Sequence, residues 1–365
     1  MTSTQQLRRS TRRSQARFLT TSARPKNLRG LPCLPDEIYL EILSHLPSFP
    51  LLSCHDASDI ATYGPRRLAL DALSQTCSDL RRVFLRYRWQ RIEVYSQMEL
   101  EVGRGPLPKT RYNRKGKSVA GNRAYAMELV RQLEVVTVRE PGLAQVVNVL
   151  DIYITDYSAE TVIPELARCM SLMPNLHTVY IDFAFFGAIG FHQSSIIIDS
   201  FAPYKYPQIK NANVSLNAFF FISRCPDLKV LHIQRRHLWL RNVPDFLNYI
   251  VDACPAIEIL GNILVPQAFP FNAPACPKLN VYIEIFSRFQ HLHDVTFALN
   301  ALPRDSDMQA IWKTANLRTV RILFNLSTYF THDQVEEWKT QMKTLLLKIS
   351  SGSKGGHKQL IVTTA

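Results

Sequence analysis

Proline-marked breaks divide most of the chain into short apolar segments. Four of these breaks share a form in which an apolar, helix-like stretch ends in a proline and an aliphatic residue follows two positions later. They are CMSLMPNL at 169–176, CPDL at 225–228, CPAI at 254–257 and CPKL at 276–279. Proline interrupts a helix and leaves the residue before it extended. Each copy therefore predicts a helix followed by a strand.

The predicted strands share the spacing Leu-x-x-Leu/Val-x-Ile/Val/Phe. The matches are Leu133-Val136-Val138, Val147-Leu150-Ile152, Leu176-Val179-Ile181, Leu228-Leu231-Ile233, Leu292-Val295-Phe297 and Leu317-Val320-Ile322. One such unit cannot bury its apolar side alone, so neighbouring units are expected to stack on one core with their strands in a parallel sheet. The separations are uneven: 52 residues from Leu176 to Leu228, then 29 to Ile257 and 22 to Leu279. The repeats are degenerate, and insertions or unrecognised units are implied.

Two helical segments precede the repeats. Residues 31–47 start with prolines and acidic residues and carry Ile38, Ile42 and Leu46 at helical spacing. A second helix is predicted from about 66 to 88, with residues 53–65 as a polar loop. At the far end, a capping box at 331–334 predicts a helix that closes the repeats, and residues 350–365 are expected to form a C-terminal tail.

The sequence LPDEIYLEILSHLP at 34–47 resembles the first helix of an F-box, and ALSQTCSDLRRVF at 72–84 resembles its second half. The following RYRWQRIEVYS is similar to the join between an F-box and the first strand in fungal F-box proteins with repeat-like bodies. The connection at 48–67 is longer than is usual for that family. The predicted fold class is α/β: a small all-α F-box module at 31–90, then an irregular leucine-rich-repeat-like solenoid at 123–349 with a parallel sheet.

This resemblance implies a module that binds the Skp-type adaptor of an SCF ubiquitin ligase and, through it, a cullin. The positions that it nominates for adaptor contact or support are Leu34, Pro35, Ile38, Ile42, Leu46, Leu73 and Cys77. Read from the residues alone, the same apolar stripe also fits an ordinary core helix. Because the ligase core supplies the chemistry, the adaptor itself is expected to have no catalytic residue and no cofactor, and to hold an unknown target protein.

Residues that flank buried apolar positions on a strand point to the opposite side of the sheet. This alternation nominates Asp151, Tyr153, Tyr180, Asp182, His232, Gln234, Thr296 and Arg321 as partner-facing positions. The alternative is that they are ordinary solvated strand residues.

The net charge of +13 is confined to two segments. Residues 1–30 hold eight basic residues and no acid, and residues 101–125 hold seven against Glu101 alone. We expect a disordered basic tail at 1–30 and a flexible basic loop at 101–122. Since the remaining body is close to neutral, nucleic acid is not the favoured partner. Nucleic-acid binding by the two segments, or a mitochondrial presequence at 1–30, is the alternative reading.

Other chemistry lacks the required spacing. Seven scattered cysteines favour a reduced compartment, cytoplasmic or nuclear, over a disulfide framework. Zinc sets built on Cys225, His232 and His237, or on Cys276, His291 and His293, lack paired ligands at close spacing. Residues 111–118 end like a phosphate-binding loop but begin with Arg111 in place of glycine. No apolar run reaches the roughly 18–20 residues of a membrane span, and we expect no enzyme activity and no metal site.

Overall fold

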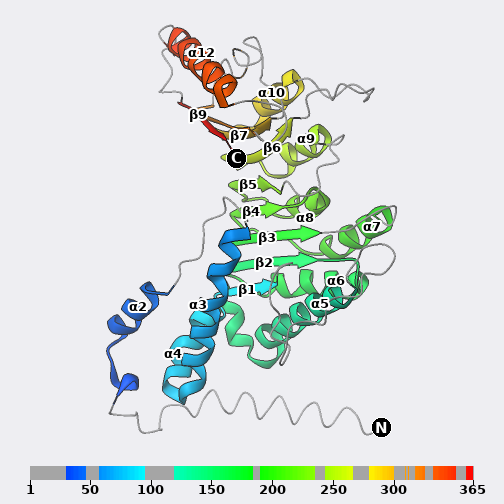
Figure 1. Ribbon diagram of the computed structural model, residues 1–365. Coiled ribbons are helices and arrows are strands. Elements are labelled where there is room, and N and C mark those ends of the chain that lie inside the picture. The colour runs from blue at the N-terminus through cyan, green and yellow to red at the C-terminus, as the bar shows by residue number, and fades with distance from the viewer. Residues whose placement is uncertain are drawn as a thin grey trace. The chain divides into compact units, whose positions relative to one another are not determined.

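The computed structural model describes residues 30–46, 57–94, 119–183, 190–234, 243–265, 279–299, 309, 311, 317–324, 332–350 and 359–364. The chain divides into two compact units, Met1–Arg88 and Trp89–Ala365 (Figure 1). The basic segments 1–29 and 101–118, and the fourth proline-marked break at 276–278, lie outside the described residues.

The first unit is helical. It contains the short 3-10 turn η2 (Leu31–Cys33) and the helices α2 (Asp36–Ser44), α3 (Ala57–Thr76) and α4 (Ser78–Arg88). Pro35 stands at the start of α2, where its missing N–H costs no intrahelical hydrogen bond. The three helices share a core of Tyr39, Leu43, Leu70, Leu80 and Phe84.

The boundaries predicted for this unit were partly wrong. Residues 57–65, expected to be loop, belong to α3, and the single helix expected at 66–88 is broken at Cys77. The Gly64-Pro65 pair favours a turn locally, yet α3 continues through both residues. The backbone carbonyl of Cys77 accepts a hydrogen bond from the N–H of Arg81 at 2.9 Å, which starts α4 directly after the break.

In its described residues, the second unit is built on one parallel sheet of nine strands in the order β1 to β9, so that each strand pairs with the next along the chain. The strands are β1 (Arg91–Val94), β2 (Val149–Ile154), β3 (Thr178–Phe183), β4 (Asn211–Val214), β5 (Val230–Ile233), β6 (Ile259–Val265), β7 (Asp294–Leu299), β8 (Thr319–Phe324) and β9 (Gln359–Thr364). The prediction of an α/β chain with a parallel sheet is confirmed.

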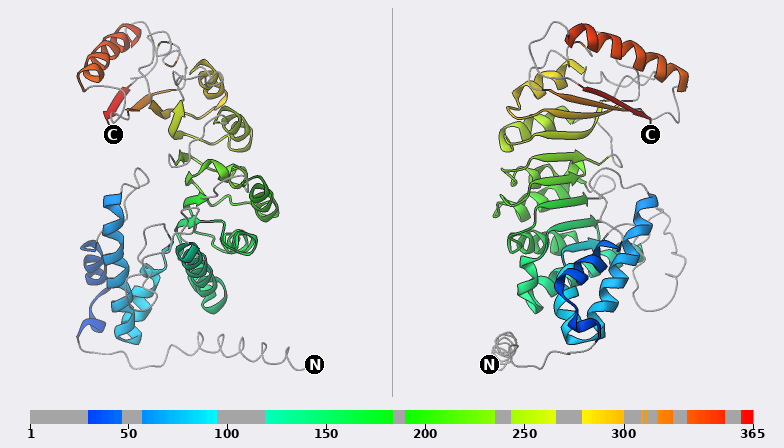
Figure 2. Two further views of the ribbon diagram at one scale, coloured as in Figure 1. Left: turned by 45° about the vertical axis from the view of Figure 1, so that its right-hand side comes forward. Right: turned by 90° about the vertical axis from the view of Figure 1, so that its left-hand side faces the viewer.

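Helical crossovers connect these strands. They are α5 (Val119–Glu134) with its π-helical extension η3 (Val135–Arg139) and the 3-10 turn η4 (Pro141–Gln145), α6 (Ala159–Ser171), α7 (Gly190–Phe201), η5 (Leu216–Ala218) with α8 (Phe219–Ile222), α9 (Val243–Ala253), α10 (Leu279–Arg288) and α12 (His332–Ser350). In Figure 2 the green and yellow helices, α5 to α10, all lie on one side of the strands. The core lies between these helices and the sheet.

Strand register explains this one-sided cover. The aligned residues Leu150, Val179, Ala212 and Leu231 are all fully buried, and so are their equivalents on β6 to β8, Leu260, Val295 and Val320. Side chains alternate between the two faces of a strand, so the residues between these buried positions belong to the face opposite the core.

A repeated turn leads into the strands. In four copies, the N–H of a buried aliphatic residue donates to the carbonyl three positions earlier, at 3.2–3.3 Å: Leu176 to Met173, Ile209 to Tyr206, Leu228 to Cys225 and Ile257 to Cys254. Three of these are the breaks recognised in the sequence. The copy at Tyr206 begins with tyrosine and continues to Ala212 instead of Leu or Val, which is why β4 was not predicted.

Two other predictions were wrong. The segment from Leu133 to Val138, expected to be a strand, is the end of α5 and η3, because Leu129, Leu133 and Val136 also form a helical stripe. The segment from Leu279 is the helix α10, and its buried Tyr282, Ile285 and Phe286 follow helical spacing.

The predicted limits of the basic loop and the C-terminal tail also change. Residues 119–122 belong to α5, and within 350–365 the residues Gln359–Thr364 form β9 by pairing with β8. The predicted helix after residue 331 is α12. No helix in the described part of the chain is both long and apolar enough to cross a membrane.

Candidate functional site

The residues nominated for adaptor contact all lie in the helical unit, but in different environments. Leu34, Ile42, Leu46, Leu73 and Cys77 are partly buried against the core of the unit. Pro35 and Ile38 are exposed, and 42% of Ile38 is accessible. The side of α2 that enters the core is formed by Tyr39 and Leu43, so the predicted stripe lies on the flank of the helix and not at its centre.

Polar contacts hold α2 against the rest of this unit. The Arg66 guanidinium donates to the carbonyls of Leu43 and Leu46, at 3.5 and 3.4 Å, which compensates the open carbonyls at the C-terminus of α2. At the other end, the Tyr39 hydroxyl donates to the carbonyl of Leu31 at 2.8 Å. Both ends of α2 are thus fixed, and its exposed flank is presented in a defined orientation.

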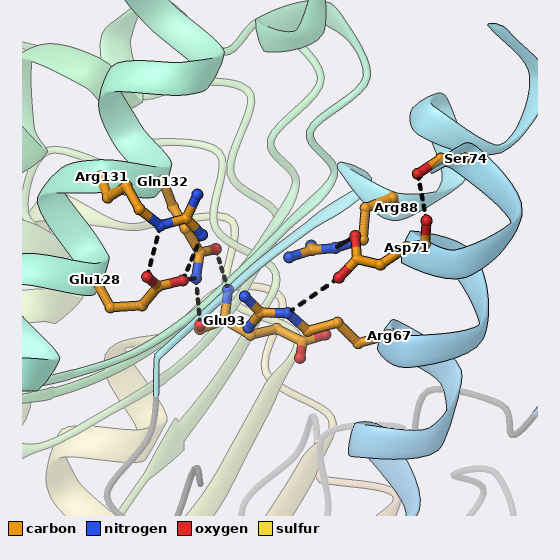
Figure 3. A network of polar contacts seen from close by, with 8 residues as sticks. All are labelled: Arg67, Asp71, Ser74, Arg88, Glu93, Glu128, Arg131 and Gln132. Carbon is orange, nitrogen blue, oxygen red and sulfur yellow. Dashed lines mark hydrogen bonds and ion pairs between the residues drawn. The ribbon is translucent and has the colours of Figure 1, made fainter. Parts of the chain in front are cut away.

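The two long helices are joined by an ion pair that Figure 3 shows. Arg88 Nε of α4 donates to Asp71 Oδ1 of α3 at 2.8 Å, and Arg67 lies on the other side of the same carboxylate. Arg88 is nearly fully buried, so its charge requires this partner.

The residues nominated on the sheet lie on five strands, β2, β3, β5, β7 and β8, or, for Gln234, directly after one of them. Each one in a strand stands between two apolar residues that are buried, so all belong to the face away from the helices, here called the open face. Asp151, Tyr180 and Asp182 are nevertheless buried, Tyr153, His232, Gln234 and Thr296 are half-buried, and Arg321 is exposed. The structure aligns Asp151, Tyr180 and His232 in one row across the sheet.

Sequence reasoning missed three members of this row, Glu93, Asn213 and Gly261. Glu93 of β1 is aligned with Asp151, and Asn213 of β4 lies between Tyr180 and His232. The Oδ1 atom of Asn213 is buried and accepts no hydrogen bond from the residues that the structure describes. Residues 209–214 follow the strand spacing as Ile-x-x-Ala-x-Val. A motif that also allowed alanine at its second apolar position would have identified Asn213.

One end of the open face carries a buried charged cluster. Arg91 forms an ion pair with Asp151, its Nε lies 3.4 Å from Glu93 Oε1, and its guanidinium stands over the ring of Tyr180 at 5.9 Å. The side chains of Arg91, Asp151 and Glu93 are all at least nine-tenths buried. Such a cluster holds β1 to β3 in one arrangement, because removing any charge leaves its partner desolvated.

Gln132 closes the outer edge of β1. Its amide accepts from the N–H of Glu93 at 3.2 Å and donates to the carbonyl of Glu93 at 2.9 Å and to Glu128 at 2.8 Å (Figure 3). Arg131 binds the same Glu128 carboxylate through two nitrogens. A fully buried side chain of α5 therefore takes the place that a further strand would occupy.

His232 lies on β5, near the middle of the sheet, and is aligned with Gly261 of β6. Burial lowers the pKa of His232 to about 4, and the charge of Arg321 acts in the same direction. The imidazole is therefore neutral at physiological pH and offers one donor and one acceptor nitrogen.

Cys169, Cys225 and Cys254 of the second unit are buried among its core residues. Burial raises the pKa of Cys254 to about 12 and that of Cys225 well above its usual value, so both remain thiols. Among the described residues, no three His, Cys, Asp or Glu side chains gather in a metal-ligating group. His237 and Cys276, which completed the two zinc sets considered from the sequence, lie outside the described residues.

Comparisons with known proteins show little. No protein-family model matches the chain, and no curated protein matches it. Among solved structures, a Bacteroides fragilis protein determined by a structural genomics consortium is similar, with a TM-score of 0.36 and 11% identity over 64% of this chain and 69% of that one.

Proposed function

We propose that this chain is the substrate-recognition adaptor of an SCF-type ubiquitin ligase. In this proposal the helical unit binds a Skp-type adaptor, and the open face of the sheet holds a target protein. The observation that carries the first part is the exposed apolar flank of α2, where Ile38 is 42% accessible although the unit has a core of its own. Exposed apolar side chains on a positioned helix fit docking into a partner's groove.

The topology of the second unit supports the role of a binding body. Strands in sequential order, with crossover helices on one side, leave the opposite face of a long sheet for contacts. Aligned positions on β2 to β9 are separated by 29, 33, 19, 29, 35, 25 and 40 residues. Some of these fall within the roughly 20–29 residues of leucine-rich repeats and others exceed it. We therefore assign the body to an irregular repeat of that kind.

Ile38→Asp is the variant that tests adaptor binding. A charge at Ile42 would also disturb the core against which that residue packs, whereas Ile38 is exposed. We expect the full chain to co-purify with a Skp-type adaptor and Ile38→Asp to weaken the complex at least about tenfold, a loss typical of a central interface residue. The measurement is pulldown followed by titration calorimetry.

Leu40→Asp provides the matched control. Leu40 is on the same helix and 55% exposed, but it lies on the opposite flank and is not among the residues that the resemblance nominates. It is expected to retain binding. If the wild-type chain does not bind, or if both variants lose binding equally while remaining folded, the proposal is wrong.

The open face requires a separate test. Arg321→Glu reverses an exposed charge on this face and should weaken capture of a target without changing Skp-type adaptor binding. The comparison uses proteins that accumulate when the chain is removed from cells. If targets bind wild type and Arg321→Glu equally, the target contacts a surface other than the open face.

A further inference from the structure

The two edge strands of the sheet, β1 and β9, differ in whether their outward backbone groups are bound. At β1, the N–H and carbonyl of Glu93 point away from β2, and the buried Gln132 amide binds both. This short strand also carries Arg91 and Glu93. Short length, charge and a covering side chain are the usual means by which proteins prevent an edge strand from pairing with another chain.

The other edge, β9, has none of these features among the described residues. Its six residues, QLIVTT, contain no charge, no proline and no glycine, and four of them are β-branched. On its outer side it pairs with no strand in the described part of the chain. A long, uncharged, β-branched edge strand is a template for strand addition.

The register identifies which backbone groups of β9 are open. Gln359 is aligned with Thr319 and donates its N–H to the carbonyl of Arg318 at 2.8 Å, so Gln359 faces β8. Because successive residues of a strand direct their N–H and carbonyl groups to opposite sides, Ile361 also faces β8. Leu360, Val362 and Thr364 direct theirs outward, and no described residue binds them.

We propose that β9 is a homodimerisation strand that pairs antiparallel with β9 of a second copy of this chain, centred on Val362. In that arrangement Val362 faces Val362 of the other copy, and Leu360 faces Thr364. Each facing pair exchanges two N–H···O bonds, as in an antiparallel ladder. No charge stands opposite a like charge, because β9 has none.

Pairing of β9 with β9 of a second copy is favoured over pairing of β9 with β1 of a second copy. Parallel pairing of β9 with β1 of the next copy would build an open fibre, but Gln132 already occupies the outer groups of Glu93. The edge that remains available in the described structure is β9 itself. Pairing β9 with β9 is isologous and closes at a dimer. This inference is independent of the proposed adaptor function.

Val362→Pro tests the pairing without removing the strand. Proline at this position loses an N–H that faces outward, so the hydrogen bonds to β8 are retained, as for prolines on natural edge strands. We expect wild type to sediment as a reversible dimer and Val362→Pro to raise its dissociation constant at least about tenfold. Ile361→Pro is the matched variant: it removes an N–H that faces β8 and should lose thermal stability.

Amide hydrogen exchange gives a second readout. In the dimer, the amides of Leu360, Val362 and Thr364 should exchange at least about tenfold more slowly at high than at low protein concentration. The amide of Ile361 faces β8 and should be unaffected. The proposal is overturned if wild type stays monomeric up to ~100 μM, if it forms open-ended oligomers, or if Val362→Pro dimerises as well as wild type. Val362→Lys repeats the test with a charge in place of proline.

Discussion

The ring of His232 occupies the space that a side chain at Gly261 would need. The two residues are aligned on β5 and β6, and a Cβ built on Gly261 would stand 1.9 Å from His232 Nδ1. Glycine is therefore required by the neighbouring imidazole, which lies across the sheet toward β6. The pair fixes the orientation of the one histidine in the aligned row of the open face.

Gly261→Ala should destabilise the protein by about 1–3 kcal/mol, because the His232 ring must leave its position. Urea denaturation measures this loss. In a His232→Ala background the obstruction is absent, so the same substitution should cost clearly less. Equal costs in the two backgrounds would show that the ring does not fill this space.

His232 should make stability depend on pH. Its pKa is lowered from 6.5 to about 4, so between these values the unfolded chain binds a proton that the folded chain does not. The contribution of neutral His232 to the free energy of unfolding is fully present above about pH 6.5. It is lost as the pH decreases toward 4, by up to about 3 kcal/mol in total. Urea titrations of wild type and His232→Gln at pH 7 and pH 5 should differ in this decrease. A parallel decrease in both proteins contradicts the assignment.

Arg91→Ala should be costly because it leaves Asp151 and Glu93 buried without their shared cation. Loss of one partner of a buried ion pair typically costs about 3–5 kcal/mol. Denaturant unfolding of the full chain measures it. Replacing Arg91, Glu93 and Asp151 together by apolar residues should recover much of this loss, and failure to recover it would indicate a further role for the charges.

Asn213→Leu should increase stability. The Oδ1 atom of Asn213 is buried and accepts no hydrogen bond from the described residues, and such an atom costs about 1–3 kcal/mol. We expect a higher midpoint of thermal unfolding for the variant. If the open face uses this amide to bind a target, the stabilised variant should bind that target more weakly. A less stable variant would mean that the amide has a partner in solution.

In the helical unit, Phe84 and Ile38 should behave oppositely. Phe84 is fully buried and stacks edge-on with Tyr39 at 5.5 Å between ring centroids, so Phe84→Ala should cost about 3–5 kcal/mol. Ile38→Ala should change stability by less than about 1 kcal/mol, because the side chain is exposed. Hydrogen exchange across α2 to α4 distinguishes the two. Strong destabilisation by Ile38→Ala would place that residue in a core and would weaken the docking proposal.

The amino-acid sequence by itself determined the five strands that carry large apolar residues at the predicted spacing. The motifs at Leu150, Val179, Leu231, Val295 and Val320 correspond to β2, β3, β5, β7 and β8. The alternation of buried and outward residues is a local property of the strand, so it can be read without knowing the partner strands. For the same reason the outward positions of these strands can be predicted without the order of the strands in the sheet.

Tertiary structure decided what depends on residues distant in the chain. Leu133 to Val138 fits a strand and a helix equally well, and packing selected the helix. Glu93, Asn213 and Gly261 come from three different strands. They fall in one row because hydrogen bonds between the strands set the register. The assignment of β9 as an edge, with its open backbone groups, likewise follows from the position of β8. Side-chain periodicity is fixed within a segment, whereas alignment between segments is a property of the packed sheet.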